Sequence, residues 1–196
     1  MNIDLVKVFT EPFKIIGKNP AILIPVFIGI IVSLLFGIIG LIGPVALVVS
    51  SIIVGIISMF FYPWVTLHFK QVLSGSEVNL KESYSELKSM SLEILVLSIV
   101  VGFLIAIGFM AFVVPGIILA LFLIFSPSAL VVDKLSVTEA IKKSFSFVFN
   151  SNHFVQILIV LTIIFLLGLI PVVGIYISIL LQYILLPYIY VVYSQQ

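Results

Sequence analysis

Charged positions divide the chain into three long apolar stretches. All nine lysines and all eight acidic residues fall within residues 4–18, 70–93 and 133–143. The stretches 21–67, 94–132 and 154–192 are almost entirely apolar, and each has room for two helices of about 20 residues. The pattern therefore predicts an all-α, polytopic membrane protein with six transmembrane helices, at residues 21–42, 45–67, 92–113, 116–132, 154–170 and 173–192.

Helix-breaking residues lie near the middle of each apolar stretch. They are Gly40, Gly43 and Pro44 in the first, Pro115 and Gly116 in the second, and Pro171 and Gly174 in the third. Because proline and glycine end helices and favour tight turns, the six helices should form three helical hairpins. The fourth and fifth helices are short, and about 17 residues cover only about 26 Å. A re-entrant hairpin is the alternative there.

A segment with helical periodicity precedes each hairpin. In the first, the charged residues are spaced by three and four positions, so they share one face of a helix. The segments 80–90 and 136–148 repeat the pattern, and Ser136 and Glu139 have the spacing of a capping box. We expect three amphipathic interfacial helices. The first should place these residues at the membrane surface: Lys7, Phe9, Phe13, Lys14 and Lys18.

The order of elements recurs three times. The sequence thus predicts a single membrane domain, 1–196, made of repeats 1–75, 76–133 and 134–196. The second helix of each repeat contains a proline, and these are Pro63, Pro127 and Pro187. Proline is common in membrane helices, so a coincidence is the alternative to a true repeat.

The composition supports a membrane protein and excludes several functions. The chain is 63% hydrophobic and 9% charged, against roughly 45–50% and 25% in soluble domains. Cysteine is absent, which excludes disulfides and thiolate chemistry. A net charge of +1 and the absence of arginine give no basic field for nucleic acid.

Candidate chemistry is sparse. The spans contain no ionisable residue of the kind that couples transport to an ion gradient, and Glu93 is explained by the N-terminus of its helix. His68 and His153 lie at helix ends, where we expect their polar tips to stay wet. Ser128, His153 and Asp133 could be combined into a triad, but no nucleophile motif supports one. We expect no enzyme activity, no catalytic residue, no metal and no cofactor.

Small residues recur at four-residue spacing in three spans. Such stripes are the common means of helix packing in lipid. The predicted packing residues are Ser51, Gly55, Ser98, Gly102, Ala106, Gly174 and Ser178. The alternative is a polar lining, to which Gln182, Thr162 and Ser126 would contribute.

Aromatic residues gather near one predicted membrane surface. We interpret them as an aromatic belt of interfacial anchors. The residues are Phe60, Phe61, Tyr62, Trp64, Tyr183, Tyr188, Tyr190 and Tyr193.

The segment from Ser126 to Asp133, followed by Thr138 to Phe145 and Asn150, resembles a known kind of membrane domain. It is similar to the domain attached to some glycerophosphodiester phosphodiesterases and to related, uncharacterised six-helix membrane proteins of prokaryotes. The resemblance covers residues 110–192. It implies a membrane-embedded module without known catalytic residues of its own, and the soluble phosphodiesterase domain is not in this sequence.

The leading function is therefore a non-enzymatic integral membrane module that acts through lipid contact, oligomerisation or a membrane protein partner. The alternatives are a passive channel or permease for a small neutral solute and, third, a lipid-metabolising enzyme. All lysines fall on one side of the predicted spans, so the positive-inside rule predicts a multi-pass protein of the cell membrane with both termini in the cytoplasm.

Overall fold

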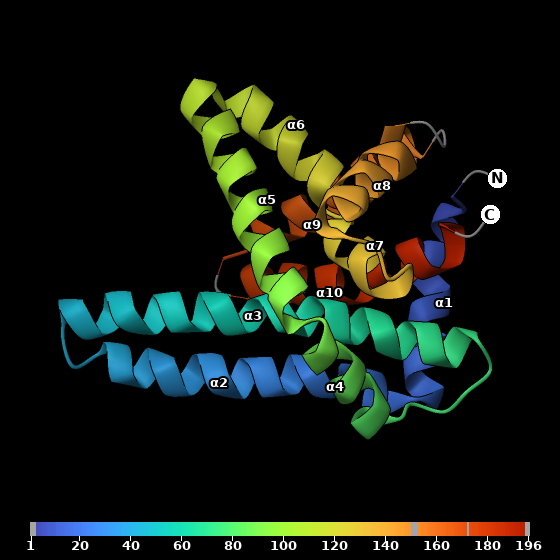
Figure 1. Cartoon of the computed structure of the whole chain (residues 1–196), viewed down its shortest axis with the longest axis horizontal. Coiled ribbons are helices and arrows are strands. Elements are labelled where there is room, and N and C mark those ends of the chain that lie inside the picture. The colour runs from blue at the N-terminus through green and yellow to red at the C-terminus, as the bar shows by residue number, and fades with distance from the viewer. Residues whose placement is uncertain (1–2, 150–152, 172, 195–196) are drawn as a thin grey trace.

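The computed structural model describes residues 3–149, 153–171 and 173–194, and all regular secondary structure in these ranges is helical. The elements in chain order are α1 (Leu5–Lys18), η1 (Pro20–Leu23), α2 (Ile24–Gly40), α3 (Pro44–Leu73), α4 (Leu80–Ser89), α5 (Ser91–Ala111), α6 (Val113–Leu123), α7 (Ser126–Val132), α8 (Val137–Phe149), α9 (Phe154–Gly168) and α10 (Gly174–Tyr193) (Figure 1).

Within the described residues, five helices are long and apolar enough to cross a membrane. They are η1 with α2, α3, α5, α6 with α7, and the stretch Tyr176–Tyr193 of α10. A sixth is added if α8 and α9 are counted as one broken span. The helix α9 alone has 15 residues, or about 22 Å. The fold is that of a multi-pass, all-helical membrane protein.

The fourth span differs from the sequence expectation. The chain turns at Phe112, whose backbone is extended (φ −167°, ψ 161°), and not at Pro115 and Gly116. Pro115 instead lies in the first turn of α6, where a missing N–H costs no helical hydrogen bond. The expected single helix 116–132 is also interrupted between α6 and α7.

Short helices begin at all three predicted places, and each begins at a polar cap. The side chain of Asp4 accepts a hydrogen bond from the backbone N–H of Lys7 (3.2 Å). Asn79 does the same for Glu82 at the start of α4 (3.1 Å). At α8 the roles are reversed: a Glu139 carboxylate oxygen accepts from the backbone N–H of Ser136 (3.0 Å), which is one of the two hydrogen bonds of a capping box.

The buried core is concentrated where the C-terminal half of α3, all of α7 and the C-terminal half of α10 meet. Each pair among these three helices is in contact. Val65, Ala129 and Ile189 each lie two residues after one of the three span prolines, and all are fully buried. The proline spacing in the sequence therefore marks three segments that pack together.

The short helices pack in a cyclic order around this core. When the chain is divided at residues 75 and 133, each short helix contacts the second span of the preceding segment: α4 packs on α3, and α8 packs on α7. The helix α1 closes the ring by packing on α10, so the two ends of the chain lie together (Figure 1). The backbone N–H of Asp4 donates to the hydroxyl of Tyr193 (3.2 Å).

Away from the core, the paired helices α2 and α3 and the paired helices α5 and α6 project in different directions (Figure 1). Their apolar side chains are largely exposed, with Leu41 85% and Met110 86% exposed at the two turns. The pair α5 and α6 meets through backbone, because a Cβ built on Gly108 would lie 2.9 Å from the Cα of Gly116. This glycine contact was not anticipated from the sequence.

Candidate functional site

Ser83 anchors α4 to α3. Its hydroxyl accepts a hydrogen bond from Trp64 Nε1 (3.0 Å) and lies 3.0 Å from His68 Nε2. His68 Nδ1 lies 3.3 Å from the carbonyl oxygen of Ile22. Because a carbonyl only accepts, the proton belongs on Nδ1. This leaves Nε2 as one acceptor for the Ser83 hydroxyl, whose other acceptor is the carbonyl oxygen of Leu80 (3.2 Å). This hydroxyl–imidazole pair has the composition of a nucleophile and base, but both residues are 0% exposed. The contacts hold α4 against α3.

Both histidines are buried, which corrects the expectation of wet polar tips. His153 is 3% exposed, and its ring packs against that of Phe147 with centroids 4.9 Å apart. The reason is that the lysine-bearing ends of the helices are the best-packed part of the fold. A position near the membrane surface therefore does not imply contact with water.

Ser144 anchors α8 to the break between α6 and α7, as Ser83 anchors α4 to α3. Its hydroxyl donates to the carbonyl oxygen of Phe122 (2.6 Å) and accepts from the backbone N–H of Phe125 (3.1 Å). Ser144 and Ala140 are both fully buried. The run from Glu139 to Ser144, within the segment that carries the resemblance, thus supplies a helix cap, a close-packed methyl group and this bridging hydroxyl.

Polar contacts tie the ends of the core helices together. The hydroxyl of Tyr190 donates to Asp133 Oδ2 (2.5 Å), and Lys70 Nζ donates to the carbonyl oxygen of Val132 at the end of α7 (2.8 Å). A cation is favoured there because helix C-termini carry partial negative charge. Across the neighbouring turn, Lys134 pairs with Glu86 (3.2 Å).

The prediction of an aromatic belt is wrong for several of its residues, because they are buried. Tyr188, Tyr190 and Tyr193 are 4%, 0% and 4% exposed, and Phe61 is 6% exposed. The three tyrosine rings lie in the core where α3, α7 and α10 meet, whereas the ring of Phe61 packs at Gly29 of α2. Trp64 is partly buried and packs against Tyr84 of α4, with ring centroids 5.7 Å apart.

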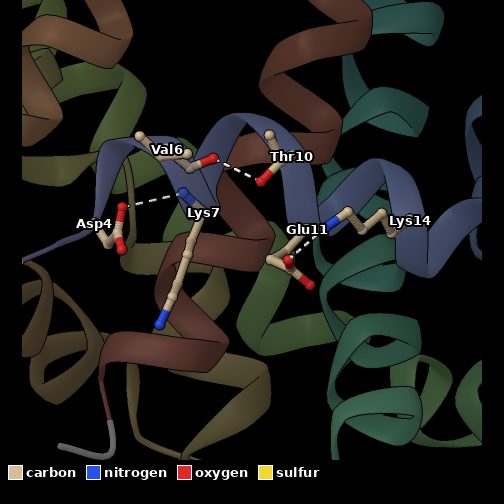
Figure 2. Close-up of polar contacts among 6 residues, drawn as sticks. All are labelled: Asp4, Val6, Lys7, Thr10, Glu11 and Lys14. Carbon is tan, nitrogen blue, oxygen red and sulfur yellow. Dashed lines mark hydrogen bonds and ion pairs between the residues drawn. The ribbon is translucent and has the colours of Figure 1, made fainter.

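The predicted interfacial residues of α1 divide between two faces. Val8 is fully buried and Phe9 packs against the core, whereas Phe13 is 42% exposed. The three lysines of α1 are exposed, and Lys14 pairs with Glu11 (3.0 Å), as Figure 2 shows. The helix is therefore docked on the fold along one face, and only the remainder of its apolar surface is free to meet lipid.

Several hydroxyls in the spans are bonded to their own helix. Ser51 donates to the carbonyl of Leu47 (2.8 Å), and Thr162 donates to that of Leu158 (2.7 Å). Ser58 and Ser98 do the same four residues back. A hydroxyl that bonds its own backbone can face lipid at little cost, so these residues need no polar pathway.

The small-residue stripe of α5 does not pack on a neighbour within this chain. Gly102 and Ala106 are exposed, and a Cβ built on Gly102 would meet nothing within 4 Å; the same space is open at Gly55. Gly174 differs, because a Cβ there would lie 2.3 Å from the carbonyl oxygen of Leu167. Close approach thus occurs between α9 and α10, and the α5 stripe faces outward.

Ser126 and Ser128 lie on α7 in the buried core. The hydroxyl of Ser128 lies 3.2 Å from that of Thr66 on α3. The hydroxyl of Ser126 is buried and has no hydrogen-bond partner among the described residues. Ser128 and Asp133 thus each have a partner other than His153, and within the described ranges no group of three His, Asp or Glu residues is placed to hold a metal.

Gln182 and Ser178 line a groove between α9 and α10. The groove has a volume of about 230 Å³, and its other walls are Leu161, Ile164, Phe165, Gly168 and Leu169. Ser178 is 8% exposed, and a Cβ built on Gly168 would lie 3.2 Å from its hydroxyl oxygen. Gln182 itself is exposed. Of the three residues proposed as a polar lining, only Gln182 presents an unbonded polar group at the surface of a span.

No protein-family model, curated protein sequence or solved structure matches the chain. What the protein does is therefore inferred from its own residues.

Proposed function

We propose that the protein is a non-enzymatic integral membrane module that acts through lipid contact, self-association or a membrane protein partner. In this proposal six helices cross the bilayer as three hairpins, with the 15-residue α9 alone as a short fifth span. The helices α1, α4 and α8 lie at the cytoplasmic surface as amphipathic interfacial helices. Both termini are cytoplasmic. The resemblance to the membrane domain of some glycerophosphodiester phosphodiesterases agrees with such a module.

The observation that carries the proposal is the division of the molecule into two zones. The lysine-bearing ends of the helices form one packed core, and the apolar remainder projects outward. Phe103 of α5 and Phe165 of α9 are each 66% exposed. Apolar surface on this scale is stable only in lipid or against another membrane protein, because contact with water is unfavourable.

Quenching of tryptophan fluorescence by lipids brominated on their acyl chains tests the lipid contact. The chain has one tryptophan, Trp64, so a Trp64→Phe background allows single probes. We expect strong quenching of Phe103→Trp and Phe165→Trp, and weak quenching of the native Trp64, which packs on α4. On α1, Phe13→Trp should be quenched more than Phe9→Trp. Equal, weak quenching at all positions would contradict the proposal.

The second candidate, a passive channel for a small neutral solute, draws support from the groove at Gln182 and Ser178. Against it, the hydroxyls of Ser51, Ser98 and Thr162 bond their own helices and so do not form a polar wall. Swelling of reconstituted vesicles in glycerol separates the two candidates. We expect vesicles that contain the protein to swell at the same rate as empty vesicles. Faster swelling would favour the channel.

A further inference from the structure

Gln182 is an exposed amide in the middle of an apolar helix. The helix α10 begins at Gly174 and ends at Tyr193. Gln182 is eight residues from the first and eleven from the second, or about 12 Å from the nearer end. Its side chain has two N–H donors and a carbonyl acceptor, and it makes no hydrogen bond to the part of the chain that the structure describes. At this depth acyl chains offer no polar atom, so the amide needs a protein partner.

Two exposed hydroxyls of the outer surface do not share this need. The exposed hydroxyls of Ser51 and Thr162 are bonded to their own helices, as described above. An amide cannot satisfy all of its groups in this way, because it has more donors and acceptors than one helix turn provides. Gln182 is therefore an exposed polar side chain whose hydrogen bonds the described part of the fold does not supply.

The surroundings of Gln182 suit a helix–helix contact. Apart from Gln182 and Ser178, the residues that line the groove between α9 and α10 are apolar. Ile179, one turn before Gln182 on the same side of α10, is 45% exposed. No charged residue lines this groove, so nothing there would repel another apolar helix.

We propose that Gln182 binds Gln182 of a second copy of this chain. Two α10 helices related by a twofold axis would cross at this residue, and each amide would donate to and accept from the other. A primary amide is complementary to itself, so an isologous contact satisfies both copies without any further chemistry. This inference rests on the proposed membrane topology, which places Gln182 in the hydrocarbon.

Cysteine cross-linking tests the contact, because the native chain has no cysteine. Ile179→Cys retains Gln182 and should form an oxidant-induced dimer in vesicles. Leu180→Cys is the matched control. Leu180 is two residues before Gln182, which places its side chain about 200° around the helix from Gln182, so it should cross-link much less. Adding Gln182→Leu to Ile179→Cys should raise the protein-to-lipid ratio for half-maximal dimer about tenfold.

Thr162→Val, added to Ile179→Cys, should leave that ratio unchanged, because the hydroxyl it removes is already bonded within α9. The inference is overturned if Gln182→Leu has no effect, or if Ile179→Cys forms no dimer at any ratio. If the tryptophan probes on α5 and α9 are quenched by lipid while no dimer forms, the proposed module stands and this contact alone is refuted.

Discussion

Replacing Ser144 by alanine removes one oxygen atom from the junction between α8 and the α6–α7 break. Two backbone groups lose their partner: the carbonyl of Phe122, 2.6 Å away, and the N–H of Phe125, 3.1 Å away. Ser144 and Phe125 are both 0% exposed, so water cannot easily replace the hydroxyl. A buried backbone group left unpaired costs about 1–3 kcal/mol. We therefore expect Ser144→Ala to lower the free energy of unfolding by about 3 kcal/mol.

The measurement is unfolding of the detergent-solubilised protein by titration with sodium dodecyl sulfate, followed by circular dichroism. Ser146→Ala is the matched control, because Ser146 is exposed on the same helix and undergoes the same chemical change. Alanine favours a helix slightly more than serine does, so the control should be neutral or slightly stabilised. Equal stability of the two variants would refute the assignment of Ser144 as the residue that holds the break.

Two further predictions concern packing and pH. Gly108→Leu should destabilise the protein by about 1–3 kcal/mol, because α6 backbone fills the space beside Gly108, whereas Gly102→Leu should not, because that space is open; similar thermal midpoints for both would contradict the contact between α5 and α6. Hydrogen bonds from the hydroxyl and backbone N–H of Ser136 hold the pKa of Glu139 below its ordinary value of 4.5. A lowered carboxyl pKa stabilises the folded state fully above the ordinary value and stops doing so as the pH falls through the lowered one. Wild type should thus exceed Glu139→Gln in thermal midpoint at about pH 7, and the difference should shrink as the pH falls below the ordinary value of 4.5; a constant difference would count against the cap.

The positions of the helices could be predicted because charge and hydrophobicity divide this chain so clearly. The caps at Asp4, Asn79 and Ser136 follow from ordinary helix-capping chemistry. The turn at Phe112 could not be placed, because the nearby Pro115 is as acceptable in the first turn of a helix as it is in a turn between helices.

Burial within the spans was much harder to predict than helix position. A residue that faces lipid and a residue that faces another helix are both apolar, so hydrophobic periodicity does not separate them. This is why Tyr190 was predicted at the membrane surface although it lies in the core, and why Gly102 was predicted to pack on a neighbour although the close contact lies at Gly108. The polar residues Ser83 and Ser144 carried a usable signal, since each lies on the apolar side of a short amphipathic helix, where a hydroxyl needs a partner.

The orientation of the chain is tested most directly by labelling single cysteines in intact cells with a membrane-impermeant thiol reagent. Ser76 and Ser136 are exposed at the lysine-bearing end, and Gly43 lies at the opposite turn between α2 and α3, where an added side chain meets no neighbour. We expect Ser76→Cys and Ser136→Cys to be protected until the membrane is permeabilised, and Gly43→Cys to react from outside. Labelling of Ser76→Cys or Ser136→Cys in intact cells would contradict this orientation.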